Sequence, residues 1–250
     1  MPFHRTVTAL AALAIPFAAA QARAGEIQVF SSTAVKTVVE ELGPQFEKAT
    51  EQKVVFRIGP AAVLKTKIDQ GAAFDVSILT VAITDDLAKQ GKIDPATRLA
   101  VAHAGIGVAV RKGAPKPDIS TVDAFKRALL NAKSIGFTAQ GASAVALQAA
   151  FVKLGIAEEL KPKIKLLDGP AGAAVAKGEV EIGMTQISEL LPYPDDELVG
   201  PLPAEIQVYT NFSAGIATAT KETGAAAAFI KFLTTPAALQ VIKAKGLEPG

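Results

Sequence analysis

The chain has 250 residues, half of them hydrophobic, with two histidines and no cysteine. A formal net charge of +2 provides no basic field of the kind that binds nucleic acid, so we expect no nucleic-acid partner. Two histidines without cysteine also argue against a zinc site, which takes three or four such ligands, and no motif indicates any other metal or a cofactor.

The first 24 residues have the pattern of a secretory signal peptide. A short basic start ending at Arg5 precedes an Ala-rich apolar stretch over residues 6–20, and Ala22-Arg23-Ala24 is a small-x-small cleavage signal. We expect cleavage after Ala24 and a periplasmic location, with an uncleaved membrane anchor as the alternative. Arg5 and Arg23 account for the excess of two positive charges, so the mature chain would be close to neutral.

The opening third predicts alternating strands and helices. Short apolar strands over residues 26–30, 53–58 and 74–79 each precede a segment with helical spacing of its apolar residues. This alternation indicates a parallel sheet covered on both faces. The turns that begin at Ser31, Gly59 and Thr80 would then share one edge of the sheet, where ligands bind in such folds.

Residues 134–148, SIGFTAQGASAVALQ, contain a further strand, small polar turn and helix start. Such a junction directs free backbone N–H groups and the positive end of a helix dipole at one spot, which suits a carboxylate or an oxyanion. Thr138, Gln140 and Ser143 are therefore candidate ligand contacts. An ordinary capped helix start is the alternative, because Ser, Thr and Gly are common there.

The remaining elements predict a second lobe and a return to the first. A strand over residues 106–110 begins a new section, with further strands at 163–167 and 181–184 and a Pro-rich loop at 191–203. Strands at 205–210 and 215–219 precede a long helix at 224–245, or a pair broken at Thr235-Pro236. We therefore expect an α/β protein of two lobes, each a mostly parallel sheet flanked by helices, joined by two crossing strands. The expected boundaries are 1–24 signal peptide, 25–103 first lobe, 104–205 second lobe and 206–250 return to the first lobe.

Six segments in the same order resemble the type II periplasmic solute-binding proteins of ABC transporters, most closely the molybdate-binding branch. They are EIQVFSST (26–33), IDQGAAFDVSIL (68–79), GKIDPATR (91–98), KLGI (153–156), KGEVEIGM (177–184) and the closing AAAAFIKFLTTPAALQVIKAKGLEP (225–249). The resemblance covers residues 26–249 and implies a two-lobe receptor that holds a small anion in the cleft between its lobes.

The resemblance also implies which positions hold the anion. Molybdate binders use hydroxyls and backbone N–H groups in the turns after the first two strands, and a tyrosine after the strand of the KGEVEIGM segment. The matching positions here are Thr33-Ala34, residues 60–62 (Pro-Ala-Ala) and Gln186. A lost hydrogen bond to a charged group costs about 1.5–3 kcal/mol. We therefore expect an anion other than molybdate or tungstate, such as an organic acid.

These arguments give one set of candidate ligand-binding residues: Ser31, Ser32, Thr33, Arg57, Pro60, Ala61, Thr138, Gln140, Ser143 and Gln186. Arg57 is included because a guanidinium near the end of the second strand would suit a carboxylate. For the hydroxyl-bearing residues helix capping is the alternative role, and for Arg57 and Gln186 a place on the solvated surface.

Two classes of function follow. The first is a monomeric receptor that closes on a small anion and delivers it to a membrane ABC permease, which requires no catalytic residue and no cofactor. The second is a cofactor-independent enzyme on the same fold, similar to relatives that interconvert the geometric isomers of aconitate by moving an allylic proton. Its base would be His103, Asp168 or Glu189. A ligand-sensing subunit is a third option.

Overall fold

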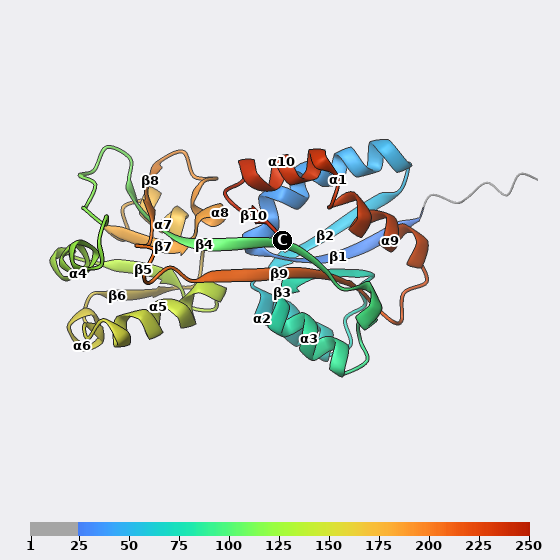
Figure 1. Ribbon diagram of the computed structural model, residues 1–250, viewed down its shortest axis with the longest axis horizontal. Coiled ribbons are helices and arrows are strands. Elements are labelled where there is room, and N and C mark those ends of the chain that lie inside the picture. Colours follow the sequence, from blue (N-terminus) through green and yellow to red (C-terminus); the bar gives the residue numbers. More distant parts are fainter. Residues whose placement is uncertain (1–24) are drawn as a thin grey trace, which may run out of the picture.

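The computed structural model describes residues 25–250 as two lobes side by side, joined by the long strands β4 (Leu99–Arg111) and β9 (Tyr209–Ile216) (Figure 1). All the longer strands belong to one mixed sheet in the order β2-β1-β3-β9-β4-β7-β5-β6, with β8 and β10 paired to β4. This arrangement confirms the predicted α/β fold of two lobes. The predicted signal peptide lies outside the described residues.

The first lobe is built on three parallel strands: β1 (Glu26–Ser32), β2 (Lys53–Gly59) and β3 (Val76–Thr80). Ser32 lies beside Gly59 in the register, so the strands end at one edge, as their predicted turns require. At the opposite edge of this sheet, the Asp75 carboxylate accepts hydrogen bonds from the Gln28 N–H and the Thr220 hydroxyl and so links β1 to the segment after β9.

Helices cover both faces of this lobe. On one face the 3-10 turn η1 and helices α1, α9 and α10 pack around Phe46 and Phe229, whose rings meet edge to face at 5.2 Å. On the other face α2 and α3 cover Phe30 and Leu79. The bounds are η1 (Thr33–Val35), α1 (Lys36–Thr50), α2 (Ala61–Asp69), α3 (Val81–Lys89), α9 (Thr223–Phe232) and α10 (Pro236–Ala244), with a second 3-10 turn η2 (Pro95–Thr97).

In the second lobe β5 pairs in parallel with β6 and β7, and β4 runs antiparallel to β7 and β8. Its main core lies under α4, α5 and α6, and α7 covers a smaller cluster around Val175. The bounds are α4 (Val122–Asn131), β5 (Ile135–Thr138), α5 (Ala142–Lys153), α6 (Ala157–Leu160), β6 (Ile164–Leu167), α7 (Ala171–Ala176), β7 (Ile182–Gln186), α8 (Ile187–Leu190) and β8 (Asp196–Pro201).

The crossing strands hold the lobes in a continuous ladder. β4 pairs with β9 from Leu99 to Gly105, and β10 (Glu248–Pro249) adds a short antiparallel partner. Just before β9 begins, the side-chain amide of Gln207 forms the two hydrogen bonds to β4 that a neighbouring strand would otherwise form. Its oxygen accepts from the Ile106 N–H at 3.0 Å and its nitrogen donates to the Ile106 carbonyl at 2.9 Å.

Three elements differ from the sequence prediction. Residues 196–201, predicted as loop, form β8, because pairing with the long β4 supplies partners that local sequence does not reveal. The two strands predicted at 205–210 and 215–219 are one strand, β9. The Gly43-Pro44 pair predicts a kink or a restart of the first helix, but α1 continues through Pro44 to Thr50. The predicted break of the closing helix at Pro236 is confirmed, with a bend of 64° between α9 and α10.

Among residues 25–250 no single helix is long and apolar enough to cross a membrane. Only α9 and α10 taken together reach that length and composition, across their bend.

Candidate functional site

Two adjoining cavities lie where the strand ends of both lobes meet. The small cavity has a volume of about 130 Å³ and is lined by Ser32, Thr33, Pro60, Ala61, Thr138, Gly141, Ala142, Asp168, Gly169, Pro170 and Glu189. The large cavity, about 450 Å³, is lined by Ala61, Ala62, Val63, Thr66, Thr80, Ile83, Ala139, Gln140, Gly141, Ala142, Val145 and Thr210. Ala61, Gly141 and Ala142 line both, so together they form one cleft between the lobes.

Helix starts surround this cleft. The first intrahelical hydrogen bond of α2 runs from the Leu64 N–H to the Pro60 carbonyl, 3.1 Å, and that of α7 from Ala174 to Pro170, 3.3 Å. The N–H groups before Leu64 in α2 therefore have no partner within their helix. Helix α5 begins at Ala142, beside both cavities. These donors carry partial positive charge from the aligned peptides and suit an anionic group.

The small cavity contains no lysine or arginine among its lining residues. Its polar side chains are the hydroxyls of Ser32, Thr33 and Thr138 and the carboxyl groups of Asp168 and Glu189. The Thr138 hydroxyl donates to the Gly169 carbonyl at 2.9 Å, which joins the turns after β5 and β6. An anion held here would therefore rely on neutral donors: backbone N–H groups, hydroxyls and a protonated carboxyl.

Glu189 lies in α8, directly after the buried strand β7. Burial raises the pKa of its carboxyl, and the hydrogen bond that its Oε2 accepts from the Thr185 hydroxyl, 2.6 Å, acts in the opposite direction. A carboxyl group with a raised pKa can act as a hydrogen-bond donor when protonated and as a stronger base when ionised. Glu189 is therefore the side chain of the cleft best suited to handle a proton.

A buried chain of polar groups extends from Glu189 to the crossing strand. The Thr185 hydroxyl oxygen lies 3.4 Å from the Ser143 hydroxyl oxygen. Its proton can be donated either to the Glu189 Oε2 or to the Gln186 Oε1, which is 3.2 Å away. The Gln186 Nε2 donates to the Thr210 hydroxyl at 3.3 Å, and Thr210 lines the large cavity. Thr185 has one proton to donate, so the protonation state of Glu189 determines which acceptor receives it.

The structure brings most of the predicted site residues together. Eight line the cleft: Ser32, Thr33, Pro60, Ala61, Thr138, Gln140, Asp168 and Glu189. Ser31, Ser143 and Gln186 are completely buried behind the lining. Gln186 is thus not the surface residue that the sequence left open, because its amide is held by Thr185 and Thr210.

Arg57 and His103 lie elsewhere. Arg57 is exposed in the body of the edge strand β2, paired with Phe30, and lines neither cavity of the cleft; its strand continues to Gly59. His103 lies within β4 between β9 and β10, with its Nδ1 2.7 Å from the Asn211 Oδ1. The structure therefore does not bring Arg57 and His103 together with the other predicted site residues in this cleft.

Sequence reasoning did not select Thr185, Thr66 and Thr210. Thr185 precedes Gln186 at a strand end, and its spacing of four residues from Glu189 was the available signal. Thr66 and Thr210 carry no comparable signal, because one lies inside a helix and the other within a crossing strand.

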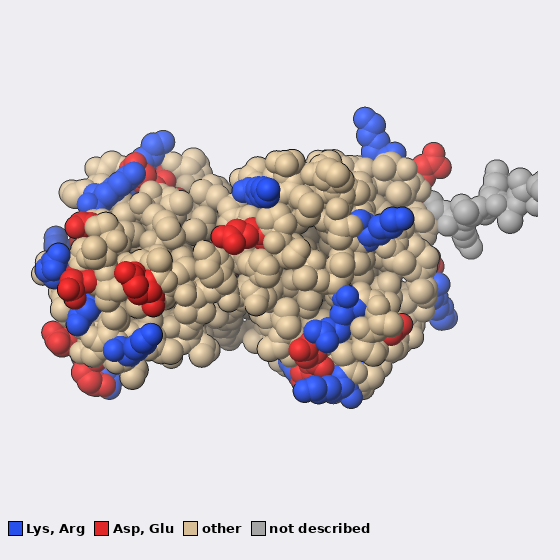
Figure 2. Space-filling view, viewed as in Figure 1, with Lys and Arg blue, Asp and Glu red and all other residues tan. Residues whose placement is uncertain are grey.

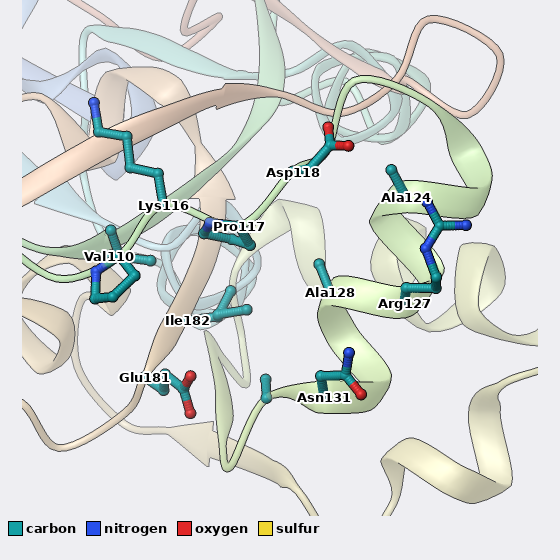
Figure 3. A pocket seen from close by; sticks show the side chains of 12 residues that line it. Val110, Lys116, Pro117, Asp118, Ala124, Arg127, Ala128, Asn131, Glu181 and Ile182 are labelled. Carbon is teal, nitrogen blue, oxygen red and sulfur yellow. The ribbon is translucent and has the colours of Figure 1, made fainter.

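A third cavity, about 390 Å³, lies on the second lobe between α4 and the segment of Lys116 and Asp118 (Figure 3). It lies beside Ile182, the first residue of β7, whereas the cleft is formed at the carboxyl ends of β5 and β7. Ligands of open α/β sheets bind at the carboxyl ends. The cleft is therefore the stronger candidate, although the guanidinium of Arg127 lines this third cavity.

Comparison with known proteins identifies the family of this chain. Residues 27–248 match the bacterial extracellular solute-binding protein family. The chain belongs to this family. It is 31% identical over 248 residues to the molybdate-binding protein ModA of Azotobacter vinelandii, covering 94% of each chain. It is also 29% identical over 229 residues to an aconitate isomerase of a Pseudomonas species, covering 89% of this chain and 87% of the isomerase.

The solved structure of the periplasmic molybdate-binding protein of Azotobacter vinelandii has the same fold, with a TM-score of 0.76 at 21% identity over 90% of this chain and 99% of that chain. This solute-binding protein is therefore of the ABC-transporter type and resembles the molybdate-binding proteins, as the sequence segments indicated. Membership of an extracellular family also identifies it as an exported protein.

Proposed function

We propose that this solute-binding protein captures a small organic carboxylate in the interlobe cleft and delivers it to an ABC permease. The observation that carries the proposal is the small cavity, where Ser32, Thr33 and the first turn of α2 supply neutral donors and none of the described lining residues is a lysine or arginine. Backbone N–H groups and hydroxyls bind a carboxylate without a full positive charge.

Two positions favour a carboxylate over molybdate. The turn after β2 offers Pro60 and Ala61, which have no side-chain donor, and the Gln186 amide is buried and bonded to Thr185 and Thr210 instead of lining the cavity. Each missing hydrogen bond to a charged group costs about 1.5–3 kcal/mol. A tetrahedral oxyanion would therefore lack side-chain donors at these two positions.

A matched pair of variants tests the location of the site. Ala62→Asp places a carboxylate at the second residue of α2, beside the large cavity, and Ala237→Asp places one at the second residue of α10, outside the cleft. Both are exposed helix starts, where an acidic residue favours the helix. In a thermal-shift screen with mono-, di- and tricarboxylates, Ala62→Asp should lose the ligand-induced shift and Ala237→Asp should keep it. Equal shifts in both variants would place the ligand elsewhere.

The raised pKa of Glu189 favours isomerisation of an unsaturated carboxylic acid as a second candidate function, and the similarity to an aconitate isomerase agrees with it. The ionised carboxylate of Glu189 would remove an allylic proton, the electron pair would shift the double bond, and the same carboxyl would return the proton. Purified protein incubated with trans-aconitate tests this function. The isomerase function would be established if the protein converts trans-aconitate to the cis isomer and if Glu189→Gln abolishes this conversion while the variant still binds trans-aconitate. If trans-aconitate stays unchanged, only the receptor function remains.

A further inference from the structure

The two cavities of the cleft differ in chemistry. The small cavity contains Asp168 and Glu189, whereas none of the residues that line the large cavity is ionisable. Ala61 and Ala142, the first residues of α2 and α5, line both, so the helix starts stand where the two cavities meet. A ligand with its anionic group at this junction would extend any remaining part into the large cavity.

Apolar side chains from both lobes line the large cavity. Val63 of α2 and Ile83 of α3 belong to the first lobe, and Val145 of α5 belongs to the second. Val145 is 77% exposed, the largest exposed fraction among the exposed large hydrophobic side chains of the described chain. The Val145 side chain is therefore open to contact by the apolar part of a ligand in this cavity.

The hydroxyls of this cavity are partly engaged by the protein itself. Thr66 donates to the Ala62 carbonyl at 3.1 Å, and Thr210 accepts from the Gln186 amide at 3.3 Å. The Thr66 proton is therefore engaged, whereas Thr210 keeps its own O–H, and the other polar lining residues, Thr80 and Gln140, are neutral. A second carboxylate would be buried here without a cationic partner, which is costly. Most of the charged side chains on the visible face also lie on the outer parts of the lobes, away from the narrow waist (Figure 2).

From these observations, and resting on the proposed function, we propose that the large cavity is a subsite for the uncharged, apolar part of the ligand. The ligand class is then a monocarboxylate with a hydrocarbon portion, not a polycarboxylate. Burial of each methylene group against Val63, Ile83 and Val145 should strengthen binding by about fourfold until the cavity is filled.

Calorimetric titration of the mature protein with acetate, butyrate, hexanoate and the tricarboxylate tricarballylate tests this subsite. We expect affinity to rise from acetate to hexanoate and tricarballylate to bind more weakly than hexanoate. Val145→Ser should weaken hexanoate binding by about tenfold with little effect on acetate. Val152→Ser is the matched control, because Val152 is 70% exposed on the same helix and lies outside both cavities.

The outcomes separate this inference from the function on which it rests. Carboxylate binding that is independent of chain length, or tighter for tricarballylate, would overturn the apolar subsite and leave carboxylate capture intact. Equal effects of Val145→Ser and Val152→Ser would also overturn it, and melting of each variant without ligand shows that both are folded. Absence of binding by every carboxylate would overturn both proposals.

Discussion

Glu189 and Thr185 form the contact on which the chemistry of the cleft depends. Burial raises the pKa of the Glu189 carboxyl, so this group remains protonated to a higher pH than an exposed glutamate. A protonated carboxyl can donate to a bound anion, whereas an ionised one repels it. Anion binding should therefore be strongest below the raised pKa of Glu189 and weaken as the pH rises through it.

Replacing Thr185 by valine should move this pH dependence. The hydroxyl stabilises the ionised form of Glu189 at 2.6 Å, so its loss raises the pKa of Glu189 further. The decline in carboxylate affinity should then occur at higher pH in Thr185→Val, while Thr185→Ser, which keeps a hydroxyl, should follow the wild type. Titrations across the pH range measure the shift; a decline at the same or lower pH in the valine variant would contradict this role.

Burial of the Asp196 carboxylate lowers the stability of the folded protein at neutral pH, and a neutral side chain at this position should remove that effect. Desolvation raises the pKa of its carboxyl from 3.8 to about 6, and its buried Oδ2 has no hydrogen-bond partner within residues 25–250. Burial disfavours only the ionised form of this carboxyl. Its contribution to the stability of the folded state is therefore fully present below the ordinary pKa, where the carboxyl is protonated, and is lost as the pH rises through about 6. Asp196→Asn should be more stable than the wild type at neutral pH, by about 1 kcal/mol, because the half-exposed group is partly screened.

Denaturant unfolding at acidic and at neutral pH measures this difference. The two proteins should differ little below about pH 4, where both side chains are uncharged. An asparagine variant that is less stable than the wild type at neutral pH would show that the carboxylate has a stabilising partner.

At the scale of the element, α8 is held by the turn that follows α10. A Cβ atom at Gly246 would lie 2.7 Å from the Leu191 Cδ1 and 2.9 Å from the Ile187 Cγ2, and the φ angle of Gly246 is +77°. This close approach joins the helix that carries Glu189, in the second lobe, to the last turn of the first lobe.

Gly246→Ala should therefore affect both stability and binding. The left-handed backbone costs an alanine about 1–2 kcal/mol, and the new methyl group would displace α8. Gly91→Ala is the control, because Gly91 has a similar φ of +70° and nothing within 4 Å of an added Cβ. Gly246→Ala should lose more stability than Gly91→Ala in thermal melts, because it adds a steric clash to the shared backbone cost, and only Gly246→Ala should weaken carboxylate binding. Equal affinities in the two variants would contradict the coupling of Gly246 to the site.

The elements also indicate what the sequence could predict. Ser32, Pro60 and Thr138 were predicted as site residues because parallel strands end at a common edge, and this rule needs only the order of strands and helices. β8 was missed because its partner β4 lies far away in the chain. Arg57 lines neither cavity because its side chain lies on the exposed face of the edge strand β2, and which face of a strand is left uncovered depends on packing that the local sequence does not show.

At the scale of the whole molecule, two lobes joined by β4 and β9 hold one cleft between helix starts of opposite lobes. The family and fold were predictable from six short segments, because they specify the arrangement of strands and helices. The ligand depends instead on side chains contributed by α2, α5 and α8, whose mutual contacts only the folded structure reveals.

The cleft should bind an organic carboxylate in preference to a metal oxyanion. A direct calorimetric comparison of hexanoate and molybdate, titrated into the same preparation of mature protein at one pH, tests it. The structure predicts measurable binding of hexanoate and binding of molybdate that is at least tenfold weaker, since the turn at Pro60 and the buried Gln186 provide no side-chain donor to the oxyanion. Tight binding of molybdate with no heat from hexanoate would contradict the account and make this protein a receptor for molybdate.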